Sequence, residues 1–378
     1  MKKNILRICF VLLVILILTY VFIIKKEETE EEFILPETAP VNTFSSVRMT
    51  TGQIDPIYDS KNIQNKRDQE KINKKVEEKL IELLNMPLKA PPVSKIFRRT
   101  FYEKDKGTYI EKKISLITSN FSVAYAYLLV PKNIDFPAPA VIAMHQHGGT
   151  KYGSEEIIGN IGDPSLAYGK ELAERGYIVF AMDAPTFGDR NDQNDDSFEV
   201  REKAEAQDLF KRGFSPLGII VQEDLISLDY LTSLDIVDKE NIGCIGHSFG
   251  GIRCMYLSAL DKRIKVTVLS SSVGSVRQDP TLGATHSWLT ILPGLGKYTE
   301  TSGILALISP RPLMIVYTED PIYFIEDTDK VIKEVNRIYE VIKAREKFYP
   351  IFIPGIHHEF PKEIHEVAYE FLDKYIKT

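Results

Sequence analysis

Short apolar runs alternate with longer amphipathic stretches through the chain beyond residue 137. Each run is rich in Val, Ile, Leu and Ala and has the length of a buried strand, whereas the stretches between them repeat apolar residues at helical spacing. Strands that alternate with helices in this way predict a mostly parallel, doubly wound sheet. The predicted strands are 140–144, 177–182, 242–245, 266–269, 313–317 and 348–353, and the predicted helices are 166–175, 217–234, 251–260, 329–344 and 363–376.

A different pattern precedes this alternation. Residues 65–86 place Ile72, Val76, Leu80 and Leu83 on one stripe, which predicts an amphipathic helix. Three segments with alternating polarity follow, joined by short turn-like sequences. They span residues 95–102, 109–117 and 123–130, and we expect them to form antiparallel strands at the entry to the sheet.

The first 26 residues have the pattern of a membrane anchor. Three cations precede the apolar run 8–24, which, together with Ile5 and Leu6, approaches the roughly 20 residues that cross a bilayer. No small-residue cleavage site closes the run, so we expect an uncleaved single-pass helix, with a cleaved signal as the alternative. The cations lie before the span and the acidic run 27–32 lies after it, which predicts a cytoplasmic N-terminus and an extracytoplasmic body.

Residues 27–63 are acidic and then rich in Pro, Thr, Ser and Asp, which predicts an extended linker between the anchor and a domain over residues 64–378. Within that domain, segments 190–214 and 273–307 fit the alternation poorly, and the second holds Trp288, the single tryptophan of the chain. Both follow predicted strand ends, where ligands bind in such sheets. They are candidate substrate-covering loops, and surface elaboration is the alternative.

Composition narrows the functional classes. The chain has 47 Lys and Arg against 53 Asp and Glu and no basic patch, so nothing indicates a nucleic-acid partner. Its three cysteines, Cys9, Cys244 and Cys254, lack the spacing of metal ligands. We interpret Cys244 and Cys254 as small buried side chains and expect no structural disulfide.

The most informative motif is Gly246-His247-Ser248-Phe249-Gly250, which lies between a predicted strand and a predicted helix. In that context Gly-x-Ser-x-Gly forms a nucleophile elbow, a turn so tight that only glycine fits at its two ends. The turn would raise Ser248 above the strand ends and direct the amide of Phe249 toward an oxyanion. The motif therefore predicts a nucleophilic serine.

A serine hydroxyl needs a neighbouring base that a carboxylate orients, and in hydrolases of this kind the order along the chain is Ser, acid, His. Glu319 and Asp320 follow the predicted strand 313–317, and His357 and His358 follow strand 348–353. Both pairs leave a choice. We favour Asp320 over Glu319 as the acid, and His358 over His357 as the base.

The loop after strand 140–144 reads His145-Gln146-His147-Gly148-Gly149. Hydrolases place the second oxyanion donor at this position, and the paired glycines let a backbone amide approach a ligand closely. Gly148 and Gly149 are both candidates, and the sequence does not choose between them. His145 and His147 have a spacing that a metal could use, but no third ligand lies near them in sequence, so no metal is predicted.

Several stretches together resemble the dienelactone hydrolase-like group of α/β-hydrolases, and in particular its branch with bacterial acetyl xylan esterases and related carboxylesterases. The stretches are 147–149, 183–185 with 188–190, 224–231 leading to 237–238, 246–251, 309–312 and 358–360. The resemblance spans about residues 90–378. It implies an α/β-hydrolase fold, a Ser248–Asp320–His358 triad and ester hydrolysis without a cofactor. Relatives often carry glycine about three residues before the acid, where this chain has Tyr317. Serine at the elbow, where dienelactone hydrolases have cysteine, favours an esterase.

The sequence thus predicts a membrane-anchored serine esterase, with Phe249 and Gly148 or Gly149 as oxyanion donors. The resemblance alone suggests short acyl groups on a sugar or small alcohol as the substrate. Two alternatives remain, a serine peptidase of the prolyl-oligopeptidase type and a non-catalytic surface binding protein. The region before residue 90 is too short for the propeller of such a peptidase. Asp183, which also ends a predicted strand, is interpreted as a residue that holds its loop by hydrogen bonds.

Overall fold

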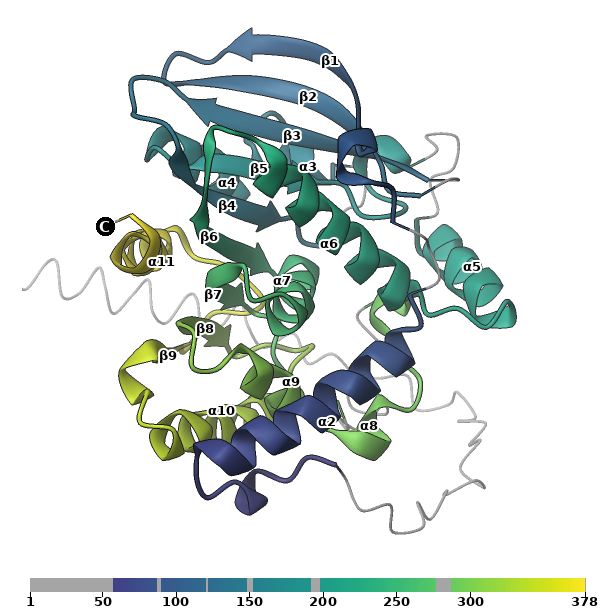
Figure 1. Cartoon of the computed structure of the whole chain (residues 1–378), viewed down its shortest axis with the longest axis vertical. Coiled ribbons are helices and arrows are strands. Elements are labelled where there is room, and N and C mark those ends of the chain that lie inside the picture. Colours follow the sequence, from purple (N-terminus) through teal and green to yellow (C-terminus); the bar gives the residue numbers. More distant parts are fainter. Residues whose placement is uncertain are drawn as a thin grey trace, which may run out of the picture. The chain divides into compact units, whose positions relative to one another are not determined.

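One mixed sheet organises the part of the chain that the structure describes (Figure 1). The structure is a computed structural model, and it describes residues 57–86, 90–119, 122–147, 152–191, 198–276 and 287–377. The sheet has nine strands in the order β1-β2-β3-β5-β4-β6-β7-β8-β9. The strands are β1 Phe97–Asp105, β2 Tyr109–Ile117, β3 Val123–Pro131, β4 Ala138–Met144, β5 Ile178–Met182, β6 Val237–His247, β7 Ile264–Ser270, β8 Leu313–Thr318 and β9 Phe348–Ile353.

One side of the sheet is antiparallel and the other side is parallel. The pairs β1–β2, β2–β3 and β3–β5 are antiparallel, whereas every pair from β5 through β4, β6, β7 and β8 to β9 is parallel. The carboxyl ends of β4, β6, β8 and β9 therefore lie along one edge. This arrangement confirms the predicted mostly parallel sheet with antiparallel N-terminal strands.

Helices cover both faces of the sheet, because the parallel strands bury alternate side chains on opposite sides. On β4, Ala140 and Ile142 belong to a core cluster with residues of helices α6 (Pro216–Ser233), α7 (Phe249–Leu260) and α10 (Ile325–Val341). Val141 and Ala143 belong to a second cluster with residues of helices α4 (Tyr168–Glu174) and α11 (Lys362–Ile376). In Figure 1, α6 and α7 lie in front of the central strands. The helices are α2 Lys66–Leu84, α3 Ser154–Ile157, α4 Tyr168–Glu174, α5 Phe198–Lys211, α6 Pro216–Ser233, α7 Phe249–Leu260, α8 Leu295–Tyr298, α9 Thr301–Ile308, α10 Ile325–Val341 and α11 Lys362–Ile376.

Helix α2 forms where the apolar stripe predicts it. The side chain of Asn65 accepts a hydrogen bond from the backbone N–H of Asp68 at 3.0 Å and so caps the first turn. Val76 and Leu80 are buried in the same core cluster as the helices in front of the sheet. Asn73 donates to the carbonyl of Ala306 at 2.8 Å, which joins α2 to α9.

The two segments that fit the alternation poorly contain helices. Segment 190–214 includes α5, and segment 273–307 includes α8, most of α9 and the 3₁₀ turn η5 (Trp288–Thr290). Every residue of α9 is buried, and its apolar side chains join the main core cluster. The interpretation of residues 301–307 as part of a substrate-covering loop is therefore wrong, because an apolar run this short can form a buried helix as readily as a strand or loop.

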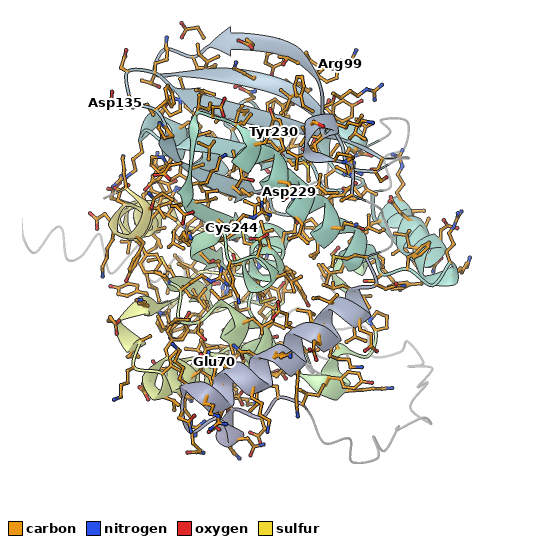
Figure 2. The ribbon with its side chains drawn as sticks, in the orientation of Figure 1. Glu70, Arg99, Asp135, Asp229, Tyr230 and Cys244 are labelled. Atoms are coloured by element: carbon orange, nitrogen blue, oxygen red, sulfur yellow. A yellow bond between two sulfur atoms is a disulfide. The ribbon has the colours of Figure 1, made fainter. Side chains whose placement is uncertain are left out.

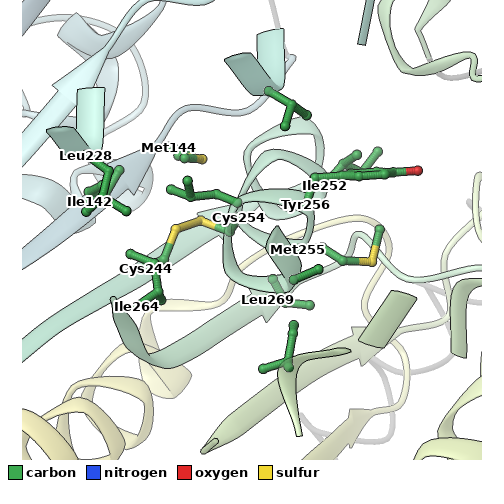
Figure 3. Packing of buried hydrophobic residues seen from close by; sticks show 14 of the residues in the cluster. Ile142, Met144, Leu228, Cys244, Ile252, Cys254, Met255, Tyr256, Ile264 and Leu269 are labelled. Carbon is green, nitrogen blue, oxygen red and sulfur yellow. A yellow bond between two sulfur atoms is a disulfide. The ribbon is translucent and has the colours of Figure 1, made fainter. Parts of the chain in front are cut away.

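A disulfide joins Cys244 on β6 to Cys254 on α7, and the expectation of unbonded cysteines is wrong (Figure 3). The elbow between the two elements turns α7 back along β6, so that two residues ten apart in sequence have Cα atoms 5.8 Å apart. Spacing along the chain does not reveal that approach. Both cysteines are buried, and in the side-chain view Cys244 lies at the centre, whereas Arg99 lies at the margin on the exposed strand β1 (Figure 2).

The predicted membrane segment within residues 1–26 and most of the predicted linker over 27–63 lie outside the described residues. Across the ranges that the structure does describe, no helix has the length and the apolar character of a membrane span. The anchor, and the boundaries at residues 26 and 63, stay predictions.

Candidate active site

Ser248 lies at the sharp turn between β6 and α7. Its backbone has φ 55° and ψ −123°, a conformation that costs free energy for a residue with a side chain and is typical of nucleophile elbows. The turn is closely packed, because a Cβ at Gly246 would overlap the backbone of Gly250, and one at Gly250 would overlap the carbonyl of Met144. The Ser248 amide donates to the carbonyl of Ser270 on β7 at 2.7 Å, which holds the turn against the neighbouring strand.

Three side chains from the ends of β6, β8 and β9 meet at this turn. The Oγ of Ser248 lies 2.7 Å from Nε2 of His358, and Nδ1 of His358 lies 2.6 Å from Oδ2 of Asp320. A carboxylate can only accept, so Nδ1–H donates to Asp320 and Nε2 is left to accept from the serine hydroxyl. The other carboxylate oxygen of Asp320 accepts from the amides of Ile322 at 2.8 Å and Tyr323 at 3.3 Å.

The structure separates the residues between which the sequence left a choice. His357 is exposed, and its Nδ1 donates to the carbonyl of Glu319 at 2.6 Å, as expected for a locally bonded loop residue. Glu319 is exposed as well, whereas the Asp320 carboxyl group is only 3% exposed. His358 and not His357 contacts Ser248, and Asp320 and not Glu319 contacts the imidazole of His358.

Aromatic side chains surround the imidazole of His358. The ring of His247 lies 5.3 Å from it and stacks in turn on Phe360 at 6.3 Å, and the ring of Tyr323 lies 6.2 Å away on another side. Ser271 donates to the carbonyl of Glu359 at 3.2 Å, which ties the loop after β9 to the end of β7. The packing limits rotation of the ring, so that His358 keeps one orientation toward Ser248.

The side of the turn where an oxyanion would form is described in part. Phe249 is the first residue of α7, so its amide is among the unpaired donors at the positive end of the helix. Its ring is buried and stacks on Phe187 with centroids 5.2 Å apart. Gly148 and Gly149, the candidates for the second donor, lie outside the described residues. The assignment of these donors stays a prediction.

His145 is a structural residue. It is buried, its Nδ1 donates to the carbonyl of Gln146 at 2.8 Å, and its Nε2 accepts from the amide of Ala184 at 3.1 Å. Burial, together with the positive charge of Arg253, lowers its pKa to about 3, so the ring is neutral. Within the described ranges, no three His, Cys, Asp or Glu side chains form a group that could hold a metal ion.

His147 pairs with a carboxylate that the sequence did not indicate. Its Nε2 lies 2.6 Å from Oε2 of Glu202 on α5. The other oxygen of Glu202 accepts from Ser287 Oγ at 2.6 Å and from the amides of Trp288 and Leu289. Burial opposes ionisation of Glu202, but the hydrogen bonds and the charge of His147 together lower its pKa. No motif marks Glu202, because it lies in a polar helix of ordinary composition.

Asp183 holds the loop after β5, as predicted. Its carboxylate accepts from the amides of Ser154 at 2.7 Å and Asp189 at 3.0 Å. Burial raises its pKa to about 6, although both backbone hydrogen bonds oppose that shift. Two carboxylates of helix α6 form ion pairs with other elements: Glu223 with Arg190 of the turn 188–190 at 2.5 Å, and Asp224 with Arg253 of α7 at 2.6 Å. Asp183, Arg190 and Asp224, which belong to stretches on which the resemblance partly rests, thus make structural contacts.

Comparisons with known proteins agree with this architecture. A model of the Abhydrolase family matches residues 37–359. A curated protein of Bacillus subtilis (strain 168), named "Putative hydrolase YtaP", is 33% identical over 282 residues, which cover 72% of this chain and 90% of that protein.

Solved structures show the same fold. One from Bacteroides fragilis NCTC 9343, described as "a putative acetyl xylan esterase", has a TM-score of 0.64 at 18% identity and covers 84% of this chain and 90% of its own. A glucuronoyl esterase from Solibacter usitatus has a TM-score of 0.58 at 14% identity and covers 82% of this chain and 94% of its own. At these identities the structures support the fold, and the chemistry must be argued from the site.

Proposed function

The chain belongs to the Abhydrolase family, and from that premise we propose that it is a serine esterase with Ser248 as nucleophile, His358 as general base and Asp320 as the acid that orients the imidazole. One observation carries the proposal. The continuous series of contacts from Ser248 Oγ through His358 to Asp320, at 2.7 and 2.6 Å, has the geometry that makes a serine hydroxyl reactive.

In the first half of the reaction, His358 Nε2 takes the proton of Ser248 while Oγ attacks the ester carbonyl. Asp320 stabilises the imidazolium that forms. The negative charge on the carbonyl oxygen develops near the amide of Phe249, where the positive end of α7 favours it. His358 then donates its proton to the departing alcohol, and the acyl group stays on Ser248.

In the second half, His358 takes a proton from water while the water oxygen attacks the acyl carbonyl. The tetrahedral intermediate collapses, Ser248 recovers its proton from His358 and the carboxylic acid leaves. Each step transfers one proton between the same imidazole and one oxygen, so the cycle needs no cofactor.

For the substrate we propose a short acyl ester of a sugar or another small alcohol. The support is indirect, since it comes from the resemblance to acetyl xylan esterases and carboxylesterases and from structural neighbours whose descriptions name acetyl xylan and glucuronoyl esterases. A screen of p-nitrophenyl esters with increasing acyl length, followed by acetylated sugars, tests this part of the proposal. A preference for long acyl chains would contradict it.

Covalent labelling tests the nucleophile directly. We expect a fluorophosphonate probe to label the wild-type protein and to leave Ser248→Ala unlabelled, since the probe reacts only with an activated serine. Ser94→Ala is the matched control, because Ser94 is an exposed serine on the 3₁₀ turn η2 (Val93–Lys95). Absence of labelling in the wild type, or labelling that persists in a folded Ser248→Ala protein, would contradict the proposal.

We further propose that residues 1–26 anchor the protein in a membrane with its catalytic domain outside the cytoplasm. The disulfide Cys244–Cys254 supports this placement, because structural disulfides persist mainly in oxidising compartments. In the producing cells, the full chain should remain with carbonate-washed membranes, and external protease should reach the domain. Recovery of the intact protein in the cytoplasmic fraction would contradict this part of the proposal.

A further inference from the structure

The carboxylate of Glu202 joins three segments that are far apart in sequence. Glu202 lies on α5, one of its oxygens contacts His147 in the loop after β4, and the other accepts from Ser287 and Trp288 at η5. The carboxyl group is only 3% exposed, so these hydrogen bonds replace almost all of its hydration. A buried anion with partners on two other segments holds their relative positions, since removal of the carboxylate leaves several donors unpaired.

Both partners of Glu202 reach the residue that follows the nucleophile. The His147 ring lies 6.1 Å from the ring of Phe249 in an edge-on contact and 5.6 Å from that of Phe187. On the other side, Leu289, which follows Trp288, is buried in one cluster with Phe249 and Phe187. The Phe249 amide is the proposed oxyanion donor, so a shift of either partner would be transmitted to the oxyanion side of the elbow.

The two partners differ in their surroundings, because His147 contacts buried aromatic rings whereas η5 carries an exposed one. His147 lies edge-on to the ring of Phe249, the residue whose amide is the proposed oxyanion donor. The turn η5 carries Trp288, which is 37% exposed. The Nζ of Lys203 on α5 lies 5.5 Å from the centroid of the Trp288 ring. An exposed aromatic ring on an anchored backbone can contact a ligand without loss of backbone freedom.

We propose that Glu202 is a positioning residue for the Ser248 site: through His147 it sets the rate of the chemical step, and through η5 it sets the affinity for the substrate. The inference rests on the proposed esterase function. Glu202 touches no reacting atom and acts through the two segments that it holds. No sequence motif assigns it this role, and it differs from the Asp320 that orients His358.

Two substitutions separate the roles. Glu202→Gln keeps an oxygen that can accept from η5 but removes the charge that holds His147, so kcat should fall about 10- to 100-fold with KM changed less than about twofold. Ser287→Ala keeps the His147 contact and removes one donor on η5, so KM should rise about 3- to 10-fold while kcat stays within about twofold. Both variants are assayed with one ester whose alcohol is large enough to reach η5.

Asp208→Asn is the matched control for Glu202→Gln. Asp208 lies on the same helix and forms a surface ion pair with Arg212 at 2.8 Å, so the change in charge is the same and the site is untouched. Both kinetic constants of this variant should equal those of the wild type. Thermal unfolding of each variant, with the assay kept well below its Tm, separates kinetic effects from loss of fold.

The inference is overturned if Glu202→Gln behaves like Asp208→Asn, or if Glu202→Gln and Ser287→Ala change the same constant to the same extent. It is also overturned if the loss of activity follows the loss of folded protein. Failure of the proposed function has a different signature, because wild-type protein would then neither hydrolyse the ester nor react with a fluorophosphonate. Normal labelling of Ser248 with unchanged kinetics in Glu202→Gln refutes the positioning role alone.

Discussion

Two histidine–carboxylate pairs contact residues of the elbow, and their contacts are alike although their surroundings differ. His358–Asp320 and His147–Glu202 both have a nitrogen–oxygen distance of 2.6 Å, and each carboxyl group is 3% exposed. The second oxygen of Asp320 accepts from amides two and three residues away in its own loop. The second oxygen of Glu202 accepts from a turn more than 80 residues away.

The difference concerns what each carboxylate holds still. Asp320 is held by amides of its own loop and orients a single imidazole, that of His358. The other nitrogen of this imidazole contacts Ser248. Glu202 is held by tertiary contacts and positions two segments, the loop with His147 and the turn η5. A short, buried contact between an imidazole and a carboxylate therefore does not by itself identify a catalytic pair. The group on the second imidazole nitrogen and the partners of the second carboxylate oxygen make the distinction.

The largest expected effect tests the catalytic half of this comparison. In Asp320→Asn, an amide N–H replaces the carboxylate oxygen that accepts from Nδ1–H of His358. The imidazole then adopts the tautomer with its proton on Nε2, so that it cannot accept the serine proton. We expect kcat for p-nitrophenyl acetate to fall about 10³- to 10⁴-fold. The unfolding temperature should change little, because the second carboxylate oxygen can keep its backbone donors.

Glu319→Gln is the control for that experiment, since Glu319 is the exposed acid beside Asp320. Its kcat should equal the wild-type value. A fall of less than about tenfold in Asp320→Asn, or an equal fall in both variants, would show that the comparison assigns the acid wrongly.

A histidine without a carboxylate partner provides the next test. His145 is buried with a pKa lowered to about 3, whereas an unfolded chain takes up the proton near its ordinary value of 6.5. As the pH falls below 6.5, His145 binds a proton in the unfolded state but stays neutral in the folded state, so the free energy of unfolding decreases. His145→Gln lacks this group, so the wild-type stability relative to the variant should fall by about 2 kcal/mol between pH 7.5 and 5.

Urea unfolding at a series of pH values measures that difference. Asp183, whose raised pKa of about 6 has the opposite effect between about pH 4 and 6, is present in both proteins and cancels. A difference in unfolding free energy that stays constant across the series would mean that folding does not change the pKa of His145, and it would contradict the buried, neutral ring.

The proposed catalytic pair is easier to predict from the sequence than the proposed positioning pair, and the reason is physical. Ser248, Asp320 and His358 each follow an apolar run that must be a buried strand, and parallel strands bring their carboxyl ends to one edge. Local pattern and sheet topology together therefore suffice to place them near each other. Each of the nine strands of the described sheet overlaps a predicted one, three predicted from alternating polarity and six from apolar runs, although β6 begins at Val237 and not at residue 242.

The contacts of Glu202, the disulfide and the choice between His357 and His358 depend on how segments pack in three dimensions. Glu202 meets Ser287 because α5 and η5 lie against each other, and no periodicity within either segment encodes that contact. The disulfide was missed for the same reason, since only the return of α7 along β6 brings Cys254 to Cys244. The choice between His357 and His358 needed the geometry of the loop after β9, where one ring turns toward Ser248 and its neighbour turns outward.

The smallest expected effect concerns that last choice. His357 is exposed and donates only to the backbone carbonyl of Glu319, so its removal leaves an acceptor that water can reach. His357→Ala should therefore change kcat/KM by less than about threefold, whereas His358→Ala should lose activity to about the level of Ser248→Ala. The same ester assay serves for all three variants. A large loss in His357→Ala would mean that the carbonyl of Glu319 needs its partner to keep Asp320 in place, and that this carboxylate, like Glu202, depends on contacts from outside its own loop.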